Sequence, residues 1–145
     1  MLKQRIITAI VLLAILLPAL FYPSYVPFGV VMLVLIGAGA WEWGRLNGCG
    51  KLQSVFLGVE AVALCGLSWW LGLLQQRLPL VWIIAGAAWV LCGGLLLRAG
   101  VVGWPSVPRA LRLVGGLLAL WVAWLAAVQA RVVGINFLLS VLVLV

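Results

Sequence analysis

Residues 80–97 read LVWIIAGAAWVLCGGLLL, eighteen positions without one charged side chain. Crossing about 30 Å of hydrocarbon takes roughly 20 apolar residues in a helix that rises about 1.5 Å per residue. A membrane-spanning β-strand would instead alternate apolar and polar residues with a period of two, whereas this stretch is apolar on every face. It therefore predicts a helix surrounded by lipid and by other helices.

Comparable runs lie on both sides of this stretch. Backbone groups in lipid must form their hydrogen bonds internally, so each run is predicted to be helical. Over the whole chain, residues 1–145, we predict an all-α fold, a polytopic transmembrane helical bundle of five full spans and a truncated sixth. The predicted spans are residues 6–22, 26–41, 52–74, 78–97, 111–130 and 132–145, with Pro23, Ser24 and Tyr25 forming the first turn.

The last run is short. It ends the chain at Val145, fourteen residues after Arg131, so as a helix it would extend only about 21 Å. No charged or aromatic anchor follows it, which is unusual for a natural membrane helix. We therefore expect the chain to be a fragment whose remainder is missing.

The composition supports a membrane location. Hydrophobic residues make up 68% of the 145 positions and charged residues 8%, whereas soluble domains carry about 25% charged residues. A domain of this size cannot hide so much apolar surface from water. The net charge of +7 comes from cations scattered singly between apolar runs, so the sequence predicts no nucleic-acid partner.

The cations predict the orientation of the chain. Seven fall on one side of the predicted spans (Lys3, Arg5, Arg45, Lys51, Arg98, Arg109 and Arg112) and two on the other (Arg77 and Arg131). Short cytoplasmic loops are enriched in Lys and Arg, so we expect a cytoplasmic N-terminus. The first span lacks a convincing cleavage site and more spans follow it, which favours an uncleaved anchor over a signal peptide.

Few residues could carry chemistry. The chain has no His, and its two acidic residues are Glu42 and Glu60, so it contains no Asp. Without these ligands a self-contained metal site is improbable. The three cysteines, Cys49, Cys65 and Cys92, fit neither a zinc pattern nor a closed disulfide framework and are interpreted as small apolar residues. No catalytic, cofactor-binding or metal-binding residue is assigned.

Each glutamate allows two interpretations. Glu60 follows Lys51 by nine residues, about 13 Å along a helix, which places it below the headgroups. It either reaches water or pairs with an arginine such as Arg112, or it couples protons or contacts substrate. Glu42 stands between two tryptophans and either orients Arg45 or another arginine, or is a solvated interfacial charge.

Small residues and cations form two further patterns. Glycine and alanine clusters predict close helix packing rather than a phosphate cradle, which needs a strand, a loop and a lysine; they are Gly37–Ala40, Gly93–Gly94 and Gly115–Gly116. The connection that carries Arg98, Arg109 and Arg112 is either a positive-inside anchor or a site for a phosphate-bearing lipid.

Three segments together resemble bacterial phosphatidate cytidylyltransferase, the CDP-diacylglycerol synthase family. These are MLKQRIITA at residues 1–9, AWEWGRL at 40–46 and LRLVGGLLALW at 111–121. Their order and spacing are similar to the N-terminal half of that enzyme. Glu42 and Trp43 match the AWEW segment and Arg112 the Leu-Arg-Leu segment, whereas Glu60 matches no motif.

The resemblance implies a bacterial inner-membrane enzyme that condenses CTP with phosphatidate to CDP-diacylglycerol and pyrophosphate, with Mg²⁺. In the family an aspartate-containing stretch follows the helix corresponding to 135–145, and a signature with Ser, Lys, Asp and His lies farther on. Neither exists in this chain, so no catalytic residue is carried over, and the chain alone is predicted to be inactive.

Two functions remain as hypotheses. The first is the membrane part of a phosphatidate cytidylyltransferase, with membrane lipids as partners, phosphatidate and CTP as ligands of the complete enzyme, and a homo-oligomer left open. The second is a small secondary transporter or an assembly partner that uses Glu60. No convincing internal repeat supports a transporter.

Overall fold

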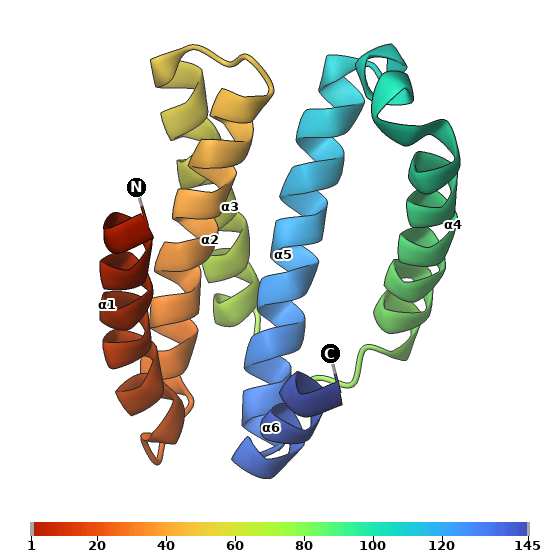
Figure 1. Ribbon diagram of the computed structural model, residues 1–145. Helices are drawn as coiled ribbons and strands as arrows, with labels where there is room; N and C mark the ends of the chain where they lie inside the picture. Colours follow the sequence, from red (N-terminus) through yellow and green to blue (C-terminus); the bar gives the residue numbers. More distant parts are fainter. Residues whose placement is uncertain (1, 145) are drawn as a thin grey trace.

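The computed structural model describes residues 2–144, and the side chains of residues 6–100 and 103–144. These residues form helices without any strand (Figure 1), so the prediction of an all-α fold is confirmed. The helices are α1 (Leu2–Phe21), α2 (Val26–Leu46), α3 (Lys51–Trp70), α4 (Pro79–Gly103), η1 (Trp104–Ser106), α5 (Arg109–Val133) and α6 (Ile135–Leu144).

Four helices are long and apolar enough to cross a membrane: α2, α3, α5 and the part of α4 from Pro79 to Gly100. The apolar parts of α1 and α6, Ile6–Phe21 and Ile135–Leu144, are shorter. Length and apolarity thus support four spans. The predicted count of five full spans and a truncated sixth stays a prediction.

Several helix ends differ from the predicted ones. Helix α2 continues through Glu42 to Leu46. Tryptophan and arginine side chains suit a last helical turn as well as an interfacial loop, so the sequence did not show where this helix ends. Helix α3 stops at Trp70 instead of Leu74, and the turn after it contains Gly72 at a positive φ of 73°. The expected connection after Arg98 is largely helical, with a break at Gly100, where φ is 63°. Glycine adopts such left-handed angles at little cost, so both breaks occur at glycines.

The core of the bundle lies where α2, α3 and α5 meet (Figure 1). Trp124 and Val128 of α5 and Cys65 of α3 are fully buried there. Helices α2 and α3 approach closely, since a Cβ on Gly58 would lie 2.9 Å from the carbonyl oxygen of Gly37. Gly37, in the second predicted span, therefore lies at a close helix contact, as expected.

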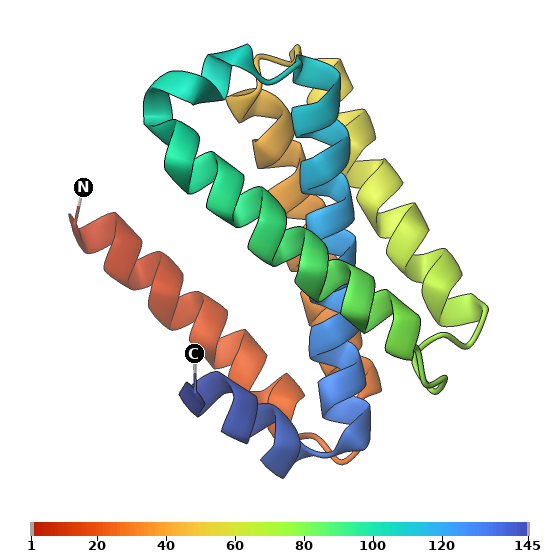
Figure 2. The ribbon, with the colours of Figure 1, turned by 90° about the vertical axis from the view of Figure 1, so that its right-hand side faces the viewer.

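Helix α4 differs from this core. None of its residues from Pro79 to Gly100 is buried, and Figure 2, seen from the side of α4, shows it crossing α5 at an angle. A Cβ on Gly93, Gly94 or Gly115 would meet no atom within 4 Å. The prediction that these three glycines permit close packing is therefore wrong within the described residues, because no helix lies against them.

An arginine attaches α1 to the bundle. The Nε of Arg131 donates to the carbonyl oxygen of Leu20 at 3.0 Å, and its Nη2 donates to that of Tyr22 at 2.6 Å. The last carbonyls of a helix have no partner within it and carry partial negative charge. Arg131, which is 9% exposed, thus caps the C-terminal end of α1.

Candidate functional site

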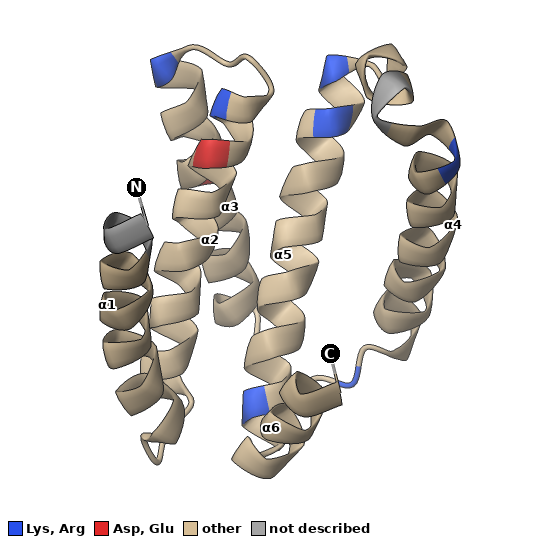
Figure 3. Ribbon diagram, in the orientation of Figure 1, with Lys and Arg blue, Asp and Glu red and all other residues tan. Residues whose placement is uncertain are grey.

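The lysines and arginines lie near helix ends (Figure 3). One end of the bundle, where α2 ends and α3 and α5 begin, carries four described cations: Arg45, Lys51, Arg109 and Arg112. We call it the cationic end. It also contains the segments AWEWGRL and LRL, so two of the three segments that prompted the family resemblance meet at this end. Lys3 and Arg5 lie outside the described side chains.

Trp43 joins α2 to α5 at this end. Its Nε1 donates to the backbone carbonyl of Arg112 at 3.1 Å. Gly116 lies one turn farther along α5, and a Cβ there would overlap the indole of Trp43. The glycine is therefore required for the indole to reach α5, and this contact fixes the position of the first turns of α5.

Arg112 packs on a second tryptophan. Its guanidinium carbon lies 5.6 Å from the centre of the Trp104 ring, within the range of a cation–π contact. Trp104 in turn meets Trp43 edge to face, with ring centres 6.1 Å apart. The Nε of Arg112 is buried and has no hydrogen-bond partner among the described residues. The guanidinium is thus held in place without a compensating carboxylate.

Arg109 contacts the turn between α2 and α3. Its Nη2 donates to the carbonyl oxygen of Gly48 at 2.9 Å and approaches the Sγ of Cys49 at 3.2 Å. Asn47, 8% exposed, donates from its Nδ2 to the carbonyl oxygen of Trp43 at 2.9 Å. The Arg109 contacts fix the turn against α5, and the Asn47 contact closes the end of α2. Cys49 therefore takes part in a polar contact, whereas Cys65 is buried as a small apolar residue would be.

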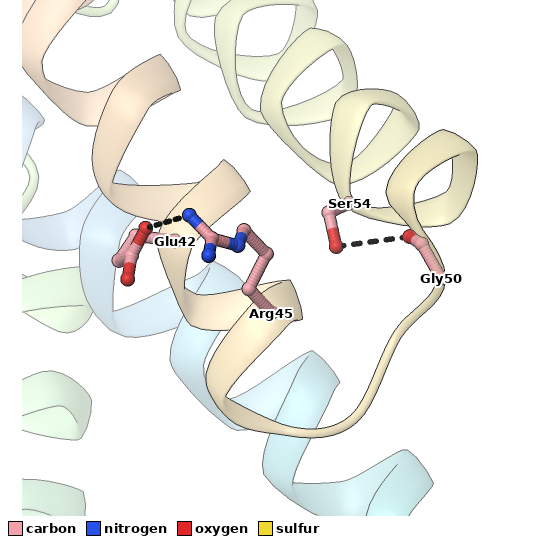
Figure 4. A network of polar contacts seen from close by, with 4 residues as sticks. All are labelled: Glu42, Arg45, Gly50 and Ser54. Atoms are coloured by element: carbon pink, nitrogen blue, oxygen red, sulfur yellow. Dashed lines mark hydrogen bonds and ion pairs between the residues drawn. The ribbon is translucent and has the colours of Figure 1, made fainter.

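Glu42 pairs with an arginine of its own helix, as Figure 4 shows. Its Oε2 lies 3.3 Å from the Nη1 of Arg45, with both side chains about half exposed. The guanidinium of Arg45 also lies 4.9 Å from the centre of the Trp41 ring. Both interpretations of Glu42 are thus partly correct, because it orients Arg45 while remaining solvated.

The same view shows how α3 begins. The hydroxyl of Ser54 donates to the carbonyl oxygen of Gly50 at 3.1 Å (Figure 4), and the side chain of Gln53 accepts from the Gly50 backbone N–H at 3.2 Å. Ser54 is fully buried against Gly44 of α2. The first turn of α3 is therefore closely packed against the end of α2.

The side chain of Glu60, in α3, is exposed. Among the described side chains, the ion pair found is the one between Glu42 and Arg45, so of the alternatives considered for Glu60, the ion pair with Arg112 is wrong. Arg112 instead lies over the Trp104 ring.

The donor set does not fit the Mg²⁺ that the resemblance implies. The chain has no Asp and no His, and over the described residues no three Cys or Glu side chains come together. Glu42 is engaged by Arg45, and Glu60 lies on the outer side of another helix. Oxygen ligands of Mg²⁺ usually include one or two carboxylates beside substrate phosphates, and the described residues bring no such set together.

Sequence reasoning missed the contact between Trp43 and Gly116 and the role of Asn47. The sequence did contain a signal for the contact between Trp43 and Gly116. Arg112 and Gly116 are four residues apart and therefore share a helix face. Asn47 directly follows the matched segment AWEWGRL, and asparagine is common near helix ends.

Comparison with known proteins bears on these motifs. The chain is 36% identical over 128 residues to the phosphatidate cytidylyltransferase of Pseudomonas aeruginosa, and the match covers 86% of this chain. The chain spans 45% of the length of that relative. No family model and no solved structure matches the chain. Together with the apolar helices, the match indicates a multi-pass membrane protein, and it confirms the resemblance of this chain to phosphatidate cytidylyltransferase.

Proposed function

We propose that the chain forms the membrane part of a phosphatidate cytidylyltransferase, an enzyme of phospholipid biosynthesis that converts CTP and phosphatidate to CDP-diacylglycerol and pyrophosphate. The observation that carries the proposal is the match itself, 36% identity over 86% of the chain. The chain corresponds to 45% of the relative. We assign catalysis to the part of the enzyme that has no counterpart here.

The small number of carboxylates in this chain supports the assignment of catalysis to the other part of the enzyme. Nucleotidyl transfer needs groups that neutralise the charge of a triphosphate, which metal ions held by carboxylates usually supply. The chain has two glutamates and no aspartate, which are too few carboxylates for that task, and Glu42 is paired with Arg45. The helices would therefore position lipid and complete a cleft at the cationic end.

We further propose that the cationic end faces the cytoplasm of a bacterial cell and that the membrane is the inner one. The positive-inside rule supports this orientation, since Arg45, Lys51, Arg109 and Arg112 share that end. Substituted cysteines at Lys51 and Arg77, in a background without the three native cysteines, test it. A membrane-impermeant thiol reagent should label position 77 in intact spheroplasts and position 51 only in inverted vesicles; the reverse pattern contradicts the orientation.

The experiment that tests the function uses the purified 145-residue chain in lipid vesicles with CTP, phosphatidate and Mg²⁺. We expect no CDP-diacylglycerol above the rate without protein, while the Pseudomonas aeruginosa relative, reconstituted in parallel, should form it. Turnover by the chain itself would contradict the assignment of catalysis to another part of the enzyme.

A further inference from the structure

Helix α3 places a carboxylate in the middle of a candidate membrane span. The helix runs from Lys51 to Trp70 and is long and apolar enough to cross a membrane. Glu60 follows Lys51 by nine residues, about 13 Å along the helix, which is farther from either end than a glutamate side chain reaches. Ionisable side chains at this depth face protein or a water-filled cavity and pair with a partner. We therefore expect Glu60 to have one.

The described part of this chain does not supply that partner. The side chain of Glu60 is exposed, and neither an ion pair nor a hydrogen bond to it is found among the described residues. The described lysines and arginines lie near helix ends (Figure 3), away from the middle of the span. The carboxylate thus lies at the surface of the bundle without a group of opposite charge.

A different side of α3 makes its contacts with the rest of the chain. Ser54 packs against Gly44 of α2, and the hydroxyl of Ser68 accepts a hydrogen bond from the Nε1 of Trp121 in α5 at 2.8 Å. Cys65 is fully buried on the same side. Helices α2 and α5 therefore cover one side of α3 and leave the side of Glu60 open.

Glu60 belongs to a continuous exposed face of α3, which we call the outer face. Its residues follow one another at alternating spacings of three and four, so they share one side of the helix, and each is exposed: Gln53, Phe56, Glu60, Ala63, Leu67 and Trp70. The mean spacing of 3.5 residues is that of helices that pack along each other at a small crossing angle. Ala63 is small enough to let a second helix approach closely beside Glu60.

A second copy of the chain does not complement this face. Two copies that cross the membrane in the same direction hold their α3 helices at the same depth, so pairing of the two outer faces brings Glu60 toward its own counterpart. Like charges repel, and the cations that such a copy could offer lie near helix ends. A helix with a basic side chain at the depth of Glu60 is the complementary partner.

We propose that the outer face of α3 binds a transmembrane helix that carries a lysine or an arginine opposite Glu60, and that this helix belongs to the part of a phosphatidate cytidylyltransferase without a counterpart in this chain. The chain spans 45% of the length of its relative, so in such an enzyme more than half of the protein packs around these helices. The identity of the partner rests on the proposed function. Glu60 then holds the two parts of the enzyme together.

The test uses a chimera in which this chain replaces the matched part of the Pseudomonas aeruginosa relative, with a protease site at the junction. A photoactivatable benzophenone amino acid replaces Phe56 on the outer face or, as a matched control, Val55. Both positions are exposed and lie at nearly the same depth, but consecutive residues point about 100° apart around a helix. After irradiation and cleavage, we expect the two parts to stay joined when the probe is at position 56 and to separate when it is at position 55.

The charge of Glu60 is tested in the same chimera. Loss of one partner of a buried charge pair weakens an interface strongly, so Glu60→Leu and Glu60→Lys should lower the yield of the joined product at least about tenfold. Glu60→Gln keeps a hydrogen-bonding group and should retain part of the yield. The matched control Glu42→Gln removes the other carboxylate of the chain and should leave the yield unchanged. Circular dichroism verifies that each variant keeps its helicity.

Several results overturn the proposal. A product that joins two copies of the chain through position 56 makes a second copy the occupant, and adducts with lipid alone make the outer face a lipid-facing surface. Equal yields at positions 55 and 56 remove the outer face as the interface, and yields that Glu60→Leu and Glu60→Lys leave unchanged remove the role of the charge.

Formation of CDP-diacylglycerol by the same chimera separates this proposal from the proposed function. Turnover without the joined product removes the interface and leaves the proposed function standing. The joined product without turnover contradicts the proposed function and leaves the interface in place.

Discussion

Helices α4 and α5 have the same length of 25 residues and opposite surroundings. The α4 span has the higher mean hydropathy, 2.3 against 2.0 for α5, yet none of its residues from Pro79 to Gly100 is buried, whereas α5 buries Trp124, Leu125, Val128, Ala130 and Arg131. Lipid tails solvate leucine as well as a protein core does, so apolarity alone does not bring membrane helices together. Polar groups and small residues with a matching partner do, and α5 has them.

The largest expected effect separates two tryptophans. Trp124 of α5 is fully buried and donates from Nε1 to the Gly29 carbonyl at 3.3 Å, whereas Trp89 of α4 is 77% exposed. We expect Trp124→Ala to lower the free energy of unfolding by about 3 kcal/mol through the cavity it leaves, and Trp89→Ala to leave it nearly unchanged. Unfolding in mixed micelles followed by circular dichroism checks the pair. Equal losses would show that α4 is packed as α5 is.

Two arginines provide the next comparison. Removing the buried guanidinium of Arg131 leaves the carbonyls of Leu20 and Tyr22 without their donor, so Arg131→Gln should cost about 2 kcal/mol. Arg98 of α4 is exposed, and Arg98→Gln should change stability by less than about 0.5 kcal/mol. Proteolysis of the α1–α2 turn, followed over time, should accelerate only in the first variant. An unchanged rate there would mean that Arg131 does not hold α1.

Replacing glycine by alanine should lower the free energy of unfolding at Gly116 and raise it at Gly94. Gly116→Ala places a methyl group into the Trp43 indole and should destabilise the chain by about 1 kcal/mol. Gly94→Ala adds a methyl group in open space and should stabilise α4 by up to about 0.8 kcal/mol through helix propensity. Thermal unfolding of both variants measures this. A stabilising Gly116→Ala would rule out the contact between Trp43 and α5.

The smallest effect is expected at Glu60. Because its side chain is exposed and joins no ion pair among the described residues, Glu60→Gln should shift the free energy of unfolding by less than about 0.5 kcal/mol. The transporter hypothesis instead predicts that proton-coupled uptake into vesicles is present and is lost in this variant. We expect no uptake in either protein, and uptake that depends on Glu60 would favour that hypothesis.

The all-helical fold could be predicted because apolar runs in lipid leave helices as the simplest way to satisfy the backbone. The helix ends were harder to place. Indole and guanidinium groups suit both a last helical turn and an interfacial loop, so AWEWG did not reveal that α2 continues to Leu46. The break at Gly100 depends on a single backbone angle that composition does not encode.

The candidate site was predicted in part. The matched segments identified Trp43 and Arg112, and the structure joins them by a hydrogen bond. Their link through Gly116 and Trp104 depends on the packing of three elements, which no single segment contains. The same limit explains why Gly93 and Gly94 were wrongly expected to pack, since small residues show that an approach is allowed but not that a helix is there.

The most direct test of the account is a chimera in which this chain replaces the matched part of the Pseudomonas aeruginosa phosphatidate cytidylyltransferase. We expect the reconstituted chimera to form CDP-diacylglycerol from CTP and phosphatidate, and this chain alone to form none. A chimera that inserts into the membrane and folds, yet forms no CDP-diacylglycerol, would contradict the claim that these helices are the membrane part of such an enzyme.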